Sequence, residues 1–190
     1  YKPLLFENVD RFILEWNELA IKNGFPGMYF IGYSLKIKEE YTKIMDLGFN
    51  AVNSRRLGYG NQKLMQRLLY KLGSLVFRLP RIFLYSSMIK HLIGAEELNE
   101  DIYPTIIPNW DHTPRSGKRG YLYHNSTPEL FGQHVDAVFK QITHKNRQIV
   151  FLKSWNEWGE GNYMEPDLKF GKGYIKALKK ALMDEHIDTK

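Results

Sequence analysis

Apolar and polar residues follow one another along this chain in a pattern that predicts five strands, most of them followed by a helix. Short apolar runs bounded by turn residues indicate buried strands, and apolar residues three or four positions apart indicate helices that bury one face. The predicted strands are residues 3–6, 27–31, 50–53, 105–107 and 148–152. Helices are predicted after residue 8, at 37–47, from 126 to about 145, and from about 173. This alternation implies parallel strands joined by right-handed crossovers.

Capping signals mark the start of two predicted helices. Asn8 can cap the first helix, and Ser126-x-x-Glu129, with Pro128 between, forms a capping box for the helix that begins at 126. We expect the apolar residues of the first and last helices to be mostly buried. These residues are Phe12, Leu14, Trp16 and Leu19 in the first helix, and Tyr174, Leu178, Ala181 and Leu182 in the last.

Composition is ordinary for a globular domain with a real core: 190 residues, 43% hydrophobic and 25% charged. No apolar run approaches the roughly 20 residues that span a bilayer. The sequence has no cysteine, which excludes disulfides, thiolate metal sites and a cysteine nucleophile within it. The chain opens at Tyr1 directly into a strand-like segment, so we expect further residues upstream in the natural protein.

The net charge of +6 arises locally. Residues 48–94 contain no Asp or Glu, yet they carry eight basic side chains: Arg55, Arg56, Lys63, Arg67, Lys71, Arg78, Arg81 and Lys90. No recognisable nucleic-acid module accompanies them, so we expect no nucleic-acid partner. Residues 57–93 are predicted to be a helical basic insertion. It is either a subdomain that packs on the core, which we expect, or an interfacial element that meets an anionic membrane or a lipid-linked sugar.

The segment 154–161 carries the most specific chemistry. Glu157 and Glu160 stand three residues apart between Trp155 and Trp158, directly after the apolar run 149–152. One carboxylate of such a pair can act as acid and the other as base or nucleophile, while indole rings stack on sugars. An E-x-x-E spacing alone is common and equally describes a solvated loop. The flanking tryptophans favour a sugar-cleaving site, because connecting loops usually avoid large apolar rings.

Four blocks resemble one known family. The run WNEWGEGNYMEPD at residues 155–167, followed by FGKGYI at 170–175, resembles the C-terminal signature of WbsX-type proteins. PNWDHTPR at 108–115, STPELF at 126–131 and KPLL at 2–5 agree with it. These bacterial polysaccharide-biosynthesis proteins are often labelled glycosyltransferases and share a domain with glycoside hydrolase family 99. The resemblance covers nearly the whole chain except 57–93.

The resemblance implies an α/β fold of a particular kind. Residues 1–190 would be the C-terminal portion of one (β/α)8 TIM barrel, about five βα units, with 57–93 inserted. Such an incomplete barrel would leave strand edges open for self-association. Catalytic residues of these barrels lie at the carboxyl ends of the strands, which is where Asn109–His112 and Trp155–Glu160 are predicted.

The resemblance also implies roles for the two carboxylates. Glu157 would be the base toward the substrate's own 2-hydroxyl, and Glu160 the general acid and then the base, through a 1,2-anhydro sugar. The spacing alone leaves retaining and inverting outcomes open, since a separation near 5 Å suits the former and a wider one the latter. Two acids this close should raise one another's pKa and leave one protonated near neutral pH.

Further residues are candidates for binding the saccharide. They are Trp155, Asn156, Trp158, Asn109, Trp110, Asp111, Tyr163 and Glu165. Asp111 either binds sugar hydroxyls or caps a turn before Pro114, and Trp110 either stacks on sugar or plugs the barrel mouth. No second histidine lies at ligand spacing from His112, so no metal site is expected. No cofactor is expected either.

These observations predict a carbohydrate-active protein of bacterial cell-surface polysaccharide biosynthesis, of the lipopolysaccharide, O-antigen or capsule type, which cleaves or transfers glycosidic bonds. Its partner would be an oligo- or polysaccharide, free or lipid-linked. A non-catalytic glycan-binding protein and a membrane-associated assembly protein are the alternatives. The resemblance favours the bacterial cytoplasm or the periphery of the inner membrane.

Overall fold

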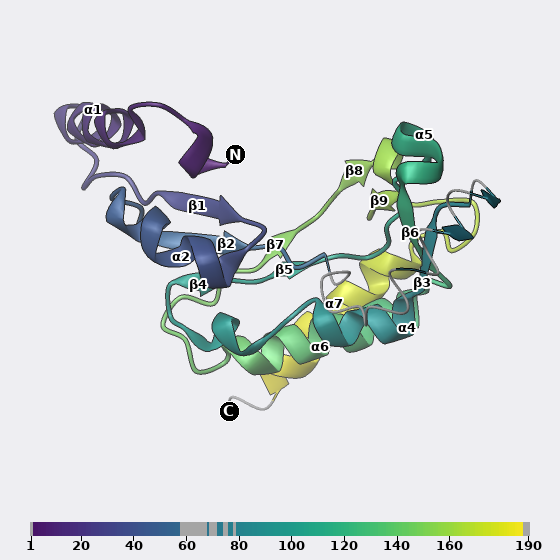
Figure 1. The fold of residues 1–190 in the computed structure, drawn as a ribbon. Helices are drawn as coiled ribbons and strands as arrows, with labels where there is room; N and C mark the ends of the chain where they lie inside the picture. The colour runs from purple at the N-terminus through teal and green to yellow at the C-terminus, as the bar shows by residue number, and fades with distance from the viewer. Residues whose placement is uncertain (1, 58–67, 69–71, 74–75, 78, 188–190) are drawn as a thin grey trace. The chain divides into compact units, whose positions relative to one another are not determined.

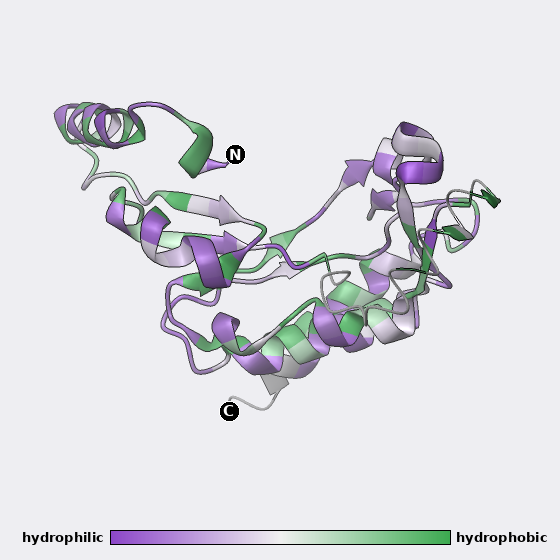
Figure 2. Ribbon diagram, in the orientation of Figure 1, coloured by the Kyte–Doolittle hydropathy of each residue, from purple (hydrophilic) through white to green (hydrophobic). Residues whose placement is uncertain are grey.

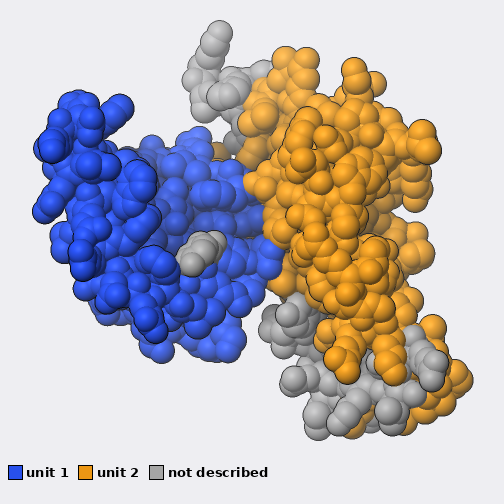
Figure 3. Space-filling view, turned by 90° about the horizontal axis from the view of Figure 1, so that it is seen from above, with its two compact units in different colours: residues 1–56, 94–105, 145–151 blue, residues 57–93, 106–144, 152–190 orange. Residues whose placement is uncertain are grey.

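The computed structural model describes residues 2–57, 68, 72–73, 76–77 and 79–187. It is an α/β structure with parallel strand pairs (Figure 1). The chain forms two compact units, coloured separately in Figure 3. Unit 1 comprises residues 1–56, 94–105 and 145–151, and unit 2 comprises 57–93, 106–144 and 152–190.

Unit 1 is built on a three-stranded parallel sheet in the order β1-β2-β4. The strands are β1 (Ile31–Ser34), β2 (Ala51–Ser54) and β4 (Ile102–Tyr103). The helices are α1 (Val9–Lys22) and α2 (Ile37–Asp46), with the 3-10 turns η1 (Pro3–Leu5) and η4 (Ala95–Leu98). The buried residues Ile37 and Ile44 of α2 pack with Val52 and Ile102 of the sheet. The helical spacing of α2 therefore positions it on the sheet as predicted.

Two expectations for the start of the chain are wrong. Residues 3–6 do not form a strand, because Pro3 begins the 3-10 turn η1, where its fixed φ and missing N–H are tolerated. Asn8 precedes α1 in the left-handed conformation, with φ of 57°, and its side chain makes no capping hydrogen bond.

Helix α1 buries a different stripe from the one predicted. Val9, Ile13 and Ala20 are its buried residues, whereas the apolar residues expected to be buried are exposed. They are Phe12, Leu14, Trp16 and Leu19. Figure 2 shows hydrophobic and hydrophilic residues alternating along this helix. Periodicity located the helix but did not distinguish between two apolar stripes.

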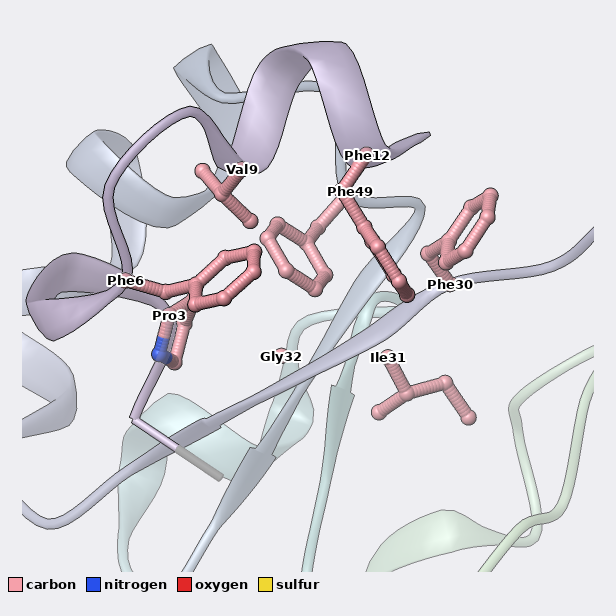
Figure 4. A pocket seen from close by; sticks show the side chains of 8 residues that line it. All are labelled: Pro3, Phe6, Val9, Phe12, Phe30, Ile31, Gly32 and Phe49. Carbon is pink, nitrogen blue, oxygen red and sulfur yellow. The ribbon is translucent and has the colours of Figure 1, made fainter. Parts of the chain in front are cut away.

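An apolar cavity of about 400 Å³ lies between α1, η1 and β1 (Figure 4). Its lining consists of Pro3, Phe6, Val9, Phe12, Phe30, Ile31, Gly32 and Phe49. Gly32 lies against the core, because a Cβ atom there would come within 2.5 Å of Ile44. The cavity is lined without a charged group, so it offers apolar contact alone.

Unit 2 centres on two long helices that lie side by side, α6 (Pro128–Ile142) and α7 (Gly173–Ile187) (Figure 1). Phe131 and Tyr174 meet edge to face between them, with ring centroids 5.8 Å apart. Pro128 occupies the first turn of α6, but the N-cap is Thr127, whose side chain accepts from the Leu130 amide. Ser126 instead donates to the Tyr123 carbonyl. The predicted capping box Ser126-x-x-Glu129 is therefore wrong, because the N-cap is one residue later and Leu130 occupies the third helical position.

The remaining elements of unit 2 are short. β3 (Arg81–Leu84) pairs in parallel with β6 (Tyr121–His124), and β8 (Asn156–Glu157) forms an antiparallel hairpin with β9 (Asn162–Tyr163). β5 (Thr105–Ile106) pairs with β7 (Phe151–Leu152) where the chain passes between the units. The short helices are α4 (Tyr85–Met88), η3 (Ile89–His91), α5 (Thr113–Ser116), η5 (Gly117–Arg119) and η6 (Trp158–Glu160).

The segment 57–93 combines buried and exposed apolar residues. Phe83, Met88 and Leu92 are buried, whereas Leu72 and Phe77 are exposed. Lys63, Arg67 and Lys71, on which the prediction of a basic helix rests, lie outside the described residues. The described part of this segment contains the strand β3 as well as short helices. Within the ranges described, no helix is long and apolar enough to cross a membrane.

Candidate active site

Glu157 and Glu160 meet at a single guanidinium. Glu157 ends β8 and Glu160 ends η6, so both stand on the hairpin that β9 completes. Arg115 Nη2 lies 2.5 Å from Glu157 Oε1, and Arg115 Nη1 lies 2.8 Å from Glu160 Oε1. Because one planar fork reaches both, the two contacted oxygens are less than about 8 Å apart. This upper limit is compatible with the separations of glycosidase carboxylate pairs.

The hairpin is held by its own polar groups. The Ser154 hydroxyl accepts from the Glu157 amide at 3.1 Å and donates to the Asn162 carbonyl at 2.7 Å. The peptide bond between Lys153 and Ser154 is cis. These contacts join the start of the loop to its end, so the two glutamates project from a closed turn.

A glycine brings this turn against Asp111. Gly161 has φ of 54°, and a Cβ atom there would lie 2.7 Å from Asp111 Cβ. The Asp111 amide donates to the Glu160 carbonyl at 2.8 Å. Only glycine combines the left-handed conformation with so close an approach. The Glu160 backbone is therefore fixed to the segment that also carries Arg115.

Glu160 is surrounded by hydrogen-bond donors. Lys153 Nζ lies 3.2 Å and Asn162 Nδ2 3.3 Å from Oε2, and His112 Nε2 lies 3.7 Å from Oε1. Burial alone would raise the pKa of Glu160, but hydrogen bonds and charge from Lys153, Asn162 and Arg115 outweigh it and lower the pKa. The expected raised pKa is therefore wrong for this residue, because nearby cations outweigh the neighbouring carboxylate.

Trp158 is a supported aromatic platform. Its ring stacks on Tyr163 with centroids 3.8 Å apart, and its Nε1 donates to Glu165 Oε2 at 2.6 Å. Trp158 is 47% exposed and Trp155 52% exposed, and Asn156 is also at the surface. Tyr163 and Glu165, predicted as sugar contacts, hold Trp158 in place. The indole rings thus offer exposed aromatic surface on the same hairpin segment as the two carboxylates.

The second predicted cluster is engaged within the protein. Asn109 Oδ1 accepts from the Tyr163 amide at 2.9 Å, and Trp110 is buried, stacked with Tyr121 at 5.5 Å. Asp111 Oδ1 accepts from the amide and hydroxyl of Thr113, at 2.9 and 2.6 Å. Of the two interpretations of Asp111, these contacts correspond to the turn cap. The cluster therefore contacts β9 of the hairpin and the turn α5 that carries Arg115.

Sequence reasoning missed Arg115 and Lys153 as members of the site. Arg115 ends the block PNWDHTPR, and Lys153 immediately precedes the segment 154–161. A search for cations near the pair of acids in sequence could have found Lys153. It could not have found Arg115, which lies more than 40 residues before Glu157. In the described parts of the chain, no group of three His, Cys, Asp or Glu residues could hold a metal ion.

The fold is similar to that of a solved structure. A solved structure described as "Glycoside hydrolase-like protein" matches 93% of this chain with a TM-score of 0.53 and 19% sequence identity. The chain covers 50% of that structure, so it spans about half of its structural relative. At this identity the likeness concerns the fold.

The chain belongs to the Glycosyltransferase WbsX family, whose model matches residues 1–178. The resemblance to WbsX-type proteins is thereby confirmed. Two proteins called "Uncharacterized protein WxcX", from two strains of Xanthomonas campestris pv. campestris, are 31% identical to this chain over 87 residues. That region is 43% of this chain and 12% of either relative.

Proposed function

We propose that this chain carries the acid–base machinery of an enzyme that cleaves or transfers glycosidic bonds during assembly of a bacterial surface polysaccharide. Lipopolysaccharide, O-antigen and capsule are polymers of this kind. The observation that carries the proposal is the meeting of Glu157 and Glu160 at one guanidinium, in a segment that also exposes the indoles of Trp155 and Trp158. Paired carboxylates next to aromatic platforms are what glycosidic chemistry requires.

The two glutamates differ in their surroundings, which supports different roles. The Glu157 side chain is 36% exposed and that of Glu160 is 16% exposed. In this proposal the more open Glu157 is the base toward a sugar 2-hydroxyl, as the family resemblance implies. Glu160 is the general acid and then the base, and it must acquire a proton before it can act as an acid. The saccharide stacks on Trp158, with Trp155 and Asn156 beside it.

The proposed framework is the C-terminal part of a (β/α)8 barrel. The three-stranded parallel sheet β1-β2-β4 and the helices α2 and α6 support it. In such a barrel the carboxyl ends of the strands carry the chemistry. Glu157 and Glu160 follow β7 in the chain, which agrees with that placement.

Glutamine substitutions test the two roles on substrates that differ in their leaving group. We expect Glu160→Gln to slow cleavage of aryl glycosides with poor leaving groups by about 10²–10⁴-fold. Glycosyl fluorides should be spared, since fluoride departs without a proton donor. Glu157→Gln should slow both substrate classes. Glu129, an exposed glutamate on α6, provides the matched control, and Glu129→Gln should change neither rate.

A panel of glycosyl fluorides and aryl glycosides of both anomers supplies the substrates. Unchanged turnover in both site variants would reject catalysis by this pair. Retained binding on a glycan array by protein that turns over no panel sugar would instead favour the non-catalytic glycan-binding protein.

A second proposal concerns the segment 57–93. From the sequence we expected a packed subdomain, but several of its apolar residues are exposed. We therefore infer the interfacial alternative, in which these residues touch an anionic lipid surface, where a lipid-linked saccharide would also lie. Val76 and Phe77 are exposed, and residues 48–94 contain no acidic side chain. Val76→Ser with Phe77→Ser should reduce flotation with anionic vesicles, and added salt should reduce it further. Equal flotation of variant and wild type would favour a subdomain without membrane contact.

A further inference from the structure

Arg115 is half exposed, yet its guanidinium has a defined position. It stands on α5, a turn that Asp111 caps through Thr113 and that a 2.9 Å contact between Ser116 Oγ and His112 Nδ1 closes. Its two terminal nitrogens point to different glutamates, at 2.5 and 2.8 Å. A long side chain on a surface normally keeps its rotamer freedom, and such pairs contribute little to stability. The fixed position therefore calls for an explanation other than stability.

Gly159 makes room for this guanidinium. A Cβ atom at Gly159 would lie 3.3 Å from both Nε and Nη2 of Arg115, closer than a side chain normally approaches. The glycine lies between the two glutamates in sequence. The hairpin therefore leaves a place for the arginine against its own backbone.

Apart from Glu157, the groups of the described residues that face Glu160 favour its anion. Arg115 and His112 approach Oε1, and Lys153 approaches Oε2, where Asn162 also donates. Glu157 is the one opposing charge, and Arg115 bridges it to Glu160. A carboxyl group that gives a proton to a sugar oxygen must first hold that proton. A proton on Glu160 Oε1 would lie against the guanidinium from which this atom accepts, so the contact opposes the protonated form.

We propose that Arg115 is a positioning residue that gathers Glu157 and Glu160 and favours the anion of Glu160, and that it must leave Glu160 before that residue can carry a proton to a sugar. The second half of this inference rests on the proposed function. The first half concerns ionisation alone and can be measured without a substrate.

Carbon-13 NMR of glutamate carboxyls measures the ionisation directly. The protein is labelled at the glutamate side-chain carboxyls, and the Glu160 signal is assigned by its loss in Glu160→Gln. We expect Arg115→Met to move the Glu160 titration midpoint upward, because a cation in contact is removed. Arg115→Lys, which keeps the charge but cannot bridge two carboxylates, should give a smaller upward shift.

Arg119 supplies the matched control. It is an exposed arginine four residues further along, and Arg119→Met removes the same charge without touching the pair. An unchanged Glu160 midpoint in Arg115→Met, or an equal shift in Arg119→Met, would overturn the inference. Gly159→Ala keeps all charges but crowds the guanidinium, and it should also move the midpoint upward.

Failure of this inference and failure of the proposed function give different results. If the midpoints shift as expected while the wild-type protein turns over no sugar, the positioning role stands and the catalytic proposal falls. If sugars are turned over, kcat/KM is measured against pH. The alkaline limb of this profile should move to higher pH in Arg115→Met, together with the Glu160 titration midpoint. An alkaline limb at the same pH in wild type and Arg115→Met would refute the proposal that Arg115 must leave Glu160 before proton transfer.

Discussion

His134 should make unit 2 sensitive to mild acid. This residue lies on the buried stripe of α6, together with Phe131, Val135 and Val138. Among the described residues, neither of its ring nitrogens has a hydrogen-bond partner. Burial lowers the pKa of His134 from 6.5 to about 4, since a charged imidazole would be desolvated there.

The sign and size of the effect follow from this pKa. Between pH 6.5 and pH 4 the unfolded chain binds a proton that the folded protein does not, so stability is complete above pH 6.5 and falls as the pH is lowered. At about 1.4 kcal/mol per pH unit, the full loss is about 3 kcal/mol. About 2 kcal/mol of it should be gone by pH 5, before most carboxylates titrate.

Urea unfolding at pH 7.5, 6.5, 5.5 and 5.0 measures this loss, with circular dichroism as the probe. His134→Leu, which is similar in volume and cannot be protonated, should remove most of the pH dependence over this range. His124 is an exposed histidine of β6, and the control variant His124→Gln should retain the wild-type slope. Equal slopes for wild type and His134→Leu would refute the reasoning, whatever their absolute stabilities.

Two further predictions concern residues that hold the structure together, and urea unfolding at neutral pH measures both. Gly161→Ala should lower the free energy of unfolding by about 2 kcal/mol or more, through a positive φ and overlap with Asp111. Gly171→Ala, with φ of 53° and no atom within 4 Å of the added Cβ, should cost about 1 kcal/mol. Glu97→Ala should cost about 3 kcal/mol, because buried Glu97 accepts from three donors in unit 1. Glu96 is partly exposed, so Glu96→Ala should lower the free energy of unfolding by at most about 1 kcal/mol.

Local signals predicted the elements whose patterns are strongest. Helix α2 was predicted at 37–47 and runs from Ile37 to Asp46, and α7 begins at Gly173 as expected. These predictions succeed because spacing, glycine and proline act within a few residues. The parallel pair β3-β6 was missed, since its strands lie about 40 residues apart and each gains its conformation from the other.

The candidate site also contains a local part, which the sequence could indicate, and a long-range part, which it could not. The carboxylate pair and its tryptophans stand within a few residues of one another, so sequence could propose them together. Arg115 reaches Glu157 only because Gly161 and Asp111 bring two distant loops into contact. The ionisation of Glu160 depends on that contact. Spacing alone therefore put the two acids near one another, but it gave the wrong direction for the pKa shift of Glu160.

The ionisation of this pair bears on whether the proposed enzyme cleaves or transfers. Cleavage of an ordinary glycosidic bond needs a proton donor, because an alkoxide leaves poorly. A donor sugar with an acidic leaving group, such as a phosphate ester, needs none, and an anionic Glu160 can then serve as the base toward the acceptor. The resting arrangement, with Arg115 and Lys153 on Glu160, favours the second kind of substrate. Arg115→Met should therefore raise the rate on aryl glycosides with poor leaving groups relative to the rate on glycosyl fluorides. An unchanged ratio of the two rates would mean that Arg115 does not control which leaving groups the site accepts.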